Sequence, residues 1–141
     1  MFNFFKQKAS QAKNESLLDP NQAVECYKQG NYQEALMRAD AMIQAAPSVA
    51  LSYRFKGEVL IEMQRYQEAI AAFSQAEKIG DPGTEELCCF RALAYINLGD
   101  TRSALALLNA QLKAKTCSPE LSMKIEKMIS KLSNSTHQQG S

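Results

Sequence analysis

A short pattern of apolar and polar residues occurs three times in the middle of the chain. Residues 30–35 (GNYQEA) recur as residues 64–69 (QRYQEA) and, more loosely, as residues 99–104 (GDTRSA). The alanine that ends each copy lies 34 and then 35 residues after the one before it. A fixed period of this size is typical of stacked helix pairs, because one pair is too small to bury its apolar face alone. The pattern therefore predicts an all-α protein of three helix-turn-helix units.

Break signals divide this region into helices. Asp19 and Pro20 form an N-cap followed by proline at the first helical position, and Gly30 ends that helix. Pro47 closes the first unit, and residues 80–83 (GDPG) close the second. Helices are accordingly expected at about residues 20–29, 32–45, 48–63, 66–79, 85–98 and 101–114.

The two ends of the chain carry separate signals. Residues 1–15 are expected to form a short amphipathic helical segment. A capping helix is predicted over residues 119–132, with an apolar stripe made by Leu121, Ile125, Met128 and Leu132. Residues 133–141 have almost nothing to bury and are expected to be disordered. The predicted domain spans residues 16–132, with units at about 16–49, 50–84 and 85–118 before the capping helix.

Charge is distributed unevenly, although the net charge is only +1. Residues 14–100 carry thirteen acidic and seven basic side chains, whereas residues 1–13 carry three lysines and no acid. Residues 101–141 carry six basic and two acidic side chains. The chain has no overall basic excess to attract nucleic acid. The basic ends are interpreted either as ordinary solvated surface or as contacts for an acidic partner or a membrane surface.

The sequence predicts a cytoplasmic protein. No apolar stretch approaches the ~20 residues needed to span a bilayer. Residues 1–6 lack the apolar core of a secretory signal.

Cysteine and histidine give no sign of a metal or a cofactor. Neighbouring cysteines on a helix point about 100° apart, which is poor geometry for a shared metal or a bond between them. The remaining candidates are scattered, and no disulfide framework is expected in a reducing compartment. The residues considered are Cys26, Cys88, Cys89, Cys117 and His137.

The three units resemble tetratricopeptide repeats (TPRs). In the second unit, which matches best, Gly57 takes the close-packing position, and the other framework residues are Tyr53, Leu60, Tyr66, Ala69, Phe73 and Ala76. The first and third units supply Ala23, Gly30, Tyr32, Ala35, Ala39 and Pro47, and Ala92, Tyr95, Gly99, Ala104 and Leu108. Departures from the family pattern are Asp19, Gln22, Lys56, Arg91 and Gln111. The resemblance covers residues 16–118 and implies a right-handed α-solenoid.

The resemblance also implies a concave groove lined by the first helix of each unit. The six family positions concerned fall within about 120° of one another on a helix. The first unit then offers Val24, Tyr27 and Lys28, the second offers Leu51, Arg54, Phe55, Glu58, Ile61 and Glu62, and the third offers Glu86, Cys89, Phe90, Leu93, Ile96 and Asn97.

Phe55 and Phe90 occupy the same place in successive units. Together with Ile61, Leu93 and Ile96 they are expected to form an apolar trough, and an exposed apolar patch with aromatic anchors usually marks a binding site. The alternative is that both phenylalanines belong to the core, or that the ends of the chain cover them.

One family activity is predicted to be missing. Repeats that hold the C-terminal carboxylate of heat-shock chaperones use lysines, an arginine and asparagines in the groove. Those places are taken here by Pro20, Val24, Phe55, Glu86 and Phe90, none of which is a cation or an amide donor. The sequence therefore predicts no binding to such tails.

Phe2, Phe4 and Phe5 lie beside two lysines, and three interpretations stay open. They cap the first repeat, they insert weakly into a membrane surface and make the protein peripheral to it, or they fill the groove of a second molecule.

No catalytic constellation is found, and the chain is not expected to be an enzyme. Glu58 and Glu62 lie one turn apart and are interpreted as carboxylates that read a basic partner rather than as an acid–base pair. The predicted function is a protein-binding adaptor or scaffold that holds a partner segment in the groove. Two alternatives are a dedicated chaperone, similar to the small helical chaperones of bacterial secretion systems, and a membrane-associated assembly factor anchored by the N-terminal phenylalanines.

Overall fold

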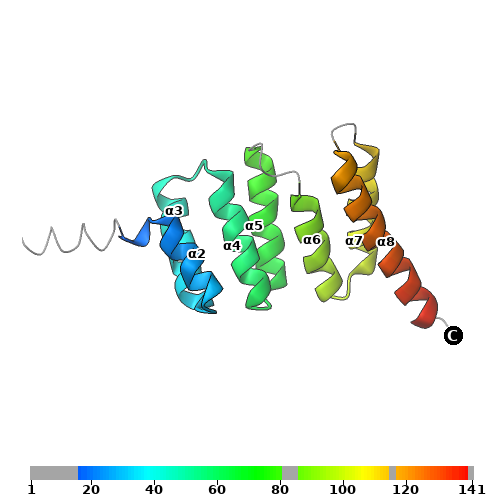
Figure 1. Ribbon diagram of the computed structural model, residues 1–141, viewed down its shortest axis with the longest axis horizontal. Helices are drawn as coiled ribbons and strands as arrows, with labels where there is room; N and C mark the ends of the chain where they lie inside the picture. Colours follow the sequence, from blue (N-terminus) through cyan, green and yellow to red (C-terminus); the bar gives the residue numbers. More distant parts are fainter. Residues whose placement is uncertain (1–15, 81–85, 115–116, 140–141) are drawn as a thin grey trace, which may run out of the picture.

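The computed structural model describes residues 16–80, 86–114 and 117–139, and this part of the chain is helical throughout (Figure 1). The predicted N-terminal segment, residues 1–15, lies outside the described residues. The six helices of the three predicted pairs are all present, and they are followed by the capping helix. Their bounds are α2 Pro20–Lys28, α3 Tyr32–Ala45, α4 Ala50–Glu62, α5 Tyr66–Ile79, α6 Leu87–Asn97, α7 Thr101–Lys113 and α8 Pro119–Gln139.

Successive helices pack against one another along one elongated row (Figure 1). The first helix of the second unit, α4, also contacts the first helix of the third unit, α6. The first helices thus form one layer and the second helices another, which confirms the predicted stack of helix pairs.

The turn inside each unit has the same hydrogen-bond pattern. The third residue after the first helix donates its amide to the carbonyl five residues earlier, at 2.8 or 2.9 Å: Asn31 to Cys26, Arg65 to Leu60 and Asp100 to Tyr95. This pattern is a Schellman C-cap, in which the residue directly before the amide donor adopts the left-handed conformation. Gly30 and Gly99 have φ angles of 81° and 82°, and Gln64 has φ of 60° at the same place. The repeated sequence pattern is therefore the signature of a repeated turn.

Both α2 and α7 begin with a side-chain cap. Asp19 accepts a hydrogen bond from the Asn21 amide at 2.9 Å, and Pro20 is the first helical residue of α2, as predicted. Asp100 caps α7 by accepting from the amide and the hydroxyl of Ser103, at 3.0 and 2.7 Å. These two hydrogen bonds hold the pKa of Asp100 below its usual value.

Two positions where the family pattern has leucine carry ion pairs between helices instead. Lys56 on α4 pairs with Asp40 on α3 at 2.7 Å, and Arg91 on α6 pairs with Glu77 on α5. Each long side chain spans the gap to the preceding helix. Pairs this close to the surface stabilise a protein by only about 0–1 kcal/mol, so the stack depends mainly on apolar packing.

The apolar core consists of two clusters. One extends from α3 to the start of α6, and the other joins α6, α7 and α8. At the centre of the first cluster, a Cβ atom added to Gly57 would meet the ring of Phe73 at 2.5–2.7 Å. Phe73 in turn stacks on Phe90 of α6, with ring centroids 5.5 Å apart and planes at 21°. Gly57 therefore lets a large ring fill the space between α4 and α5, as its close-packing position predicts.

The capping helix closes the second cluster and is longer than predicted. Leu121, Ile125 and Leu132 are buried, and Met128 is partly buried against them, which confirms the predicted stripe. The expectation that residues 133–141 are disordered is wrong for residues 133–139, because α8 continues to Gln139. These seven residues include no proline or glycine, and extending an existing helix costs far less than starting one.

Replacing Gly57 by alanine should destabilise the protein, because the added methyl group overlaps the Phe73 ring. We expect Gly57→Ala to lower the free energy of unfolding by ~1–3 kcal/mol in urea denaturation. In the double variant Gly57→Ala, Phe73→Leu, the smaller side chain should recover part of this loss relative to Phe73→Leu alone. A Gly57→Ala protein as stable as the parent would contradict this account of the helix pair.

Candidate functional site

A hollow of about 390 Å³ opens between the first helices of the first two units. Apolar side chains make up most of its wall, and one arginine and one glutamate lie at its edge. The lining residues are Pro20, Val24, Met42, Val49, Leu51, Ser52, Arg54, Phe55 and Glu58. We refer to this set of residues as the α2–α4 hollow.

The rim of the α2–α4 hollow carries exposed apolar side chains. Val24 is 39% exposed on the middle turn of α2, and Leu51 is 61% exposed on the first turn of α4. Val49, just before α4, is also exposed. Large apolar side chains gathered at one concave place on a surface are a common mark of a docking site.

The floor beside this rim is built from aromatic rings and is fixed by the core. Phe55 is partly buried against the first core cluster. Tyr27 meets Phe55 edge to face at 6.1 Å and meets Tyr32 in the same way at 5.7 Å. The contact between Tyr27 and Phe55 joins the first unit to the second beside the rim.

Two glutamates extend the site along α4. Glu58 accepts a hydrogen bond from Arg54 Nε at 3.1 Å. Glu62 accepts a long hydrogen bond, 3.4 Å, from the Tyr27 hydroxyl. Burial and the negative charges of Glu62 and Glu58 raise the pKa of Tyr27, which keeps its hydroxyl protonated as the donor. In the described part of the chain, no basic side chain lies within salt-bridge distance of Glu62.

Phe90 does not form the exposed trough that the sequence suggested. One face of its ring stacks on Phe73, and the guanidinium of Arg54 lies 5.2 Å from its centroid. Both Phe90 and Phe55 are half-buried and pack against the first core cluster. The alternative interpretation, in which the phenylalanines are part of the packing, therefore describes Phe90 better.

The groove positions of the third unit lie partly under α8. Cys89 is only 5% exposed, because it packs in one cluster with Leu121 and Ile125 of α8. It is therefore corrected from a groove residue to a core residue. Glu86 makes an ion pair with Lys124 of α8 at 3.4 Å.

The remaining predicted groove residues do not line the α2–α4 hollow. Ile61 and Ile96 are half-buried against the first and the second core cluster, respectively. Lys28, Glu62, Leu93 and Asn97 are exposed.

The structure thus brings together five of the predicted residues around one hollow, namely Val24, Leu51, Arg54, Phe55 and Glu58. The predicted groove did not include the other four lining residues, Pro20, Met42, Val49 and Ser52. Met42 had a detectable signal, since it stands 34 residues before Ala76 and places a large side chain where the second unit has a small one.

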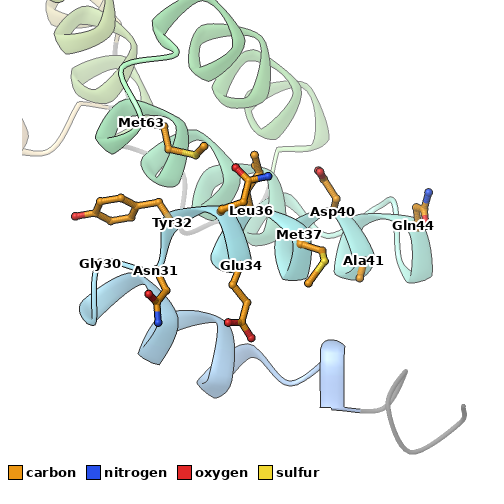
Figure 2. A pocket seen from close by; sticks show the side chains of 11 residues that line it. Gly30, Asn31, Tyr32, Glu34, Leu36, Met37, Asp40, Ala41, Gln44 and Met63 are labelled. Atoms are coloured by element: carbon orange, nitrogen blue, oxygen red, sulfur yellow. The ribbon is translucent and has the colours of Figure 1, made fainter.

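A second hollow, of about 1210 Å³, lies along α3 (Figure 2). Figure 2 shows its lining side chains spread over the length of the helix, from Tyr32 to Gln44, with Met63 at one side. Its carboxylates Glu34 and Asp40 already have cationic partners, at 3.0 and 2.7 Å. None of the predicted groove residues lines it, and polar atoms make up a larger share of its lining than in the α2–α4 hollow.

The described residues hold no group of three or more histidine, cysteine, aspartate or glutamate side chains suited to a metal ion. The hydrogen bond with Cys89, together with burial, raises the pKa of Cys88 and keeps it a protonated thiol. No helix in the described ranges is both long and apolar enough to cross a bilayer.

Substitutions should separate packing residues from rim residues. Phe90→Ala removes the ring that joins α5 to α6, and we expect it to cost ~2–4 kcal/mol of unfolding free energy. Leu51→Ala removes an exposed side chain and should stay within about 0.5 kcal/mol of the parent. Urea denaturation of both variants is the measurement. Equal losses for the two variants would mean that Phe90 is not held by its stack.

Solved structures with the same arrangement of helices include domains from distant organisms. The TPR2B domain of yeast Sti1, solved in complex with pHsp70, matches with a TM-score of 0.73 and 24% identity, over 88% of this chain and 98% of that chain. The translocator chaperone SycD of type III secretion in Yersinia enterocolitica matches with a TM-score of 0.72 and 18% identity, over 89% and 95%. The second TPR domain of human RPAP3, solved with an HSP70 peptide, gives 0.65 and 19%, over 81% and 96%. At these identities the likeness shows the fold alone.

The family itself is shown by sequence. A comparison with curated protein sequences gives no match. Two family models, each described as tetratricopeptide repeat, match residues 21–83 and 85–116, together about two thirds of the chain. The regular turns, the buried alanines and the glycine–phenylalanine contact of the second unit are the structural counterpart of that match. The chain belongs to the tetratricopeptide repeat family.

Proposed function

We propose that the α2–α4 hollow binds an extended segment of a partner protein and that the chain acts as an adaptor. As a tetratricopeptide repeat protein, the chain is a non-catalytic module for protein–protein interaction. The observation that carries the finer proposal is the apolar rim, in which Val24 and Leu51 stand exposed above the fixed ring of Phe55.

The size of the hollow favours a segment over a folded domain. A volume of about 390 Å³ is near the lower end of the usual ligand-pocket range of roughly 300–1,000 Å³. It accommodates one or two side chains, and full burial of one leucine- or phenylalanine-sized side chain gains ~1.5–3 kcal/mol. The ion pair between Arg54 and Glu58 gives this mostly apolar hollow a polar part.

A charge at the rim should abolish partner binding without unfolding the protein. In affinity purification from native cell extract, a partner of the hollow is recovered by the parent chain and lost with Leu51→Glu, because burying the new carboxylate is unfavourable. The matched control is Met37→Glu, which changes a side chain that is 54% exposed on the other hollow, along α3. For the partner so identified, we expect binding at least ~10-fold weaker with Leu51→Glu, a loss of about 1.4 kcal/mol. Equal recovery by all three proteins would place the binding site elsewhere.

Acidic chaperone tails are not expected to be the ligand, although Sti1 and RPAP3 are named with such partners. Arg54 is the basic residue of the α2–α4 hollow, and it already pairs with Glu58. Carboxylate recognition requires cationic or amide donors aimed at the ligand. In fluorescence anisotropy, the labelled peptide SGPTIEEVD should show no saturable binding up to ~100 μM, a limit near −5.5 kcal/mol. Low-micromolar binding that Arg54→Ala removes would contradict this exclusion.

A dedicated chaperone is the second candidate. The match to SycD covers 95% of that chaperone, so its whole length has the same succession of helices, and an apolar hollow suits the holding of an unfolded client. Recovery of a single stoichiometric client in the purification above supports this role, whereas several different partners support the adaptor.

A further inference from the structure

The α2–α4 hollow lies next to the point where the N-terminal segment joins the described structure. Pro20 lines the hollow, only four residues after Ser16. Ser16 is itself held in place, because its carbonyl accepts a hydrogen bond from Arg38 Nη1 at 2.7 Å and its hydroxyl donates to Gln22 Oε1 at 3.3 Å. Residues 1–15 are therefore tethered at the same end of α2 as the hollow.

The side chains of the N-terminal segment complement those of the site in the same order along the chain, apolar residues first and charged residues after them. Residues 2–5 include three phenylalanines, and Lys6 and Lys8 follow directly. Along α4 the exposed apolar rim at Leu51 comes first, and the carboxylates of Glu58 and Glu62 come after it.

The spacings also agree. From Phe55 to Glu62 is a rise of ~10 Å at 1.5 Å per helical residue. From Phe5 to Lys8 is likewise ~10 Å at about 3.3 Å per extended residue. If the segment binds in extended form, and not as the helix expected from the sequence, it brings its lysines to the glutamates when its phenylalanines lie at the rim. Glu62 has no basic side chain within salt-bridge distance in the described ranges.

The tether is long enough for the segment to reach the hollow of its own molecule. Residues 9–15 can span up to ~23 Å when extended. The nine residues of α2 rise only ~13.5 Å, so the chain can return from the far end of the groove to Ser16. A short tether also gives an effective concentration in the millimolar range, which favours the same molecule over a second copy in dilute solution.

We propose that residues 2–8 occupy the α2–α4 hollow of their own chain and compete there with the partner segment. One or two of the phenylalanines fill the apolar part, and Lys6 and Lys8 face Glu58 and Glu62. The proposal rests on the proposed function, since it takes the hollow to be the partner site. It adds that the free protein is self-occluded and that a partner must displace its N-terminal residues.

The test uses full-length chains and a synthetic peptide of residues 1–13 as the probe. The triple variant Phe2→Ser, Phe4→Ser, Phe5→Ser should leave the hollow empty, while circular dichroism shows unchanged helix content. We expect the labelled peptide to bind the triple variant at least ~10-fold more tightly than the parent, because only a small fraction of the parent has a free site. Adding Leu51→Glu to the triple variant should abolish this binding, and adding Met37→Glu should leave it unchanged.

Several results would overturn the proposal. One is equal affinity of the peptide for the parent and the triple variant. Another is sedimentation equilibrium showing a dimer in the parent and a monomer in the triple variant, which assigns the segment to a second copy. A third is flotation with anionic lipid vesicles that the triple variant loses while peptide binding stays unaltered, which assigns it to a membrane surface.

Self-occlusion and the proposed partner site would be refuted by different results. If Leu51→Glu loses the partner but the peptide does not distinguish parent from triple variant, self-occlusion is wrong and the partner site stands. If the peptide results hold while Leu51→Glu keeps the partner, the hollow belongs to the N-terminal segment and the partner binds elsewhere.

Discussion

The contact between Gly57 and the ring of Phe73 is the constraint on which the rest of the structure depends. It sets how closely α4 and α5 approach, because any side chain at residue 57 would occupy the space of the ring. Phe73 then supports Phe90 of α6, and Arg54 of α4 lies over Phe90. The close approach of α4 and α5 therefore also determines how α6 of the third unit packs on the second unit. It also fixes the face of α4 that carries the proposed binding site.

Much of this architecture could be predicted from the sequence, because local signals determine it. The turn residues, the proline after an N-cap and the 34-residue period located the helices, and the family framework marked Gly57 as a close-packing position. The errors arose where a distant element decides the outcome. The burial of Cys89 depends on α8, some thirty residues later, and the stack of Phe90 on Phe73 depends on a neighbouring unit. The last turns of α8 follow from propagation, which weak local propensities did not reveal.

The candidate site differs from the predicted groove for the same reason. The periodicity of a helix predicts which side chains share one face. It does not predict which neighbouring elements cover that face. On α2 and α4 the stripe stays open and forms the apolar hollow, whereas on α6 the capping helix covers its beginning. The proposed binding site is thus formed by the first two units, and the third unit contributes mainly to the core.

Gln64 shows that a turn within the stack can hold a residue other than glycine in the left-handed conformation. An L-residue in the left-handed conformation costs roughly 1–2 kcal/mol, yet the turn at residue 64 has the same hydrogen bonds as the turns that contain Gly30 and Gly99. The turn forms there between two closely packed helices, α4 and α5, without the glycine that would adopt its geometry freely. The turn residue is consequently less strictly specified than the buried contact between Gly57 and Phe73. Ancestry between the units of such a protein should therefore be sought in its buried contacts before its turn residues.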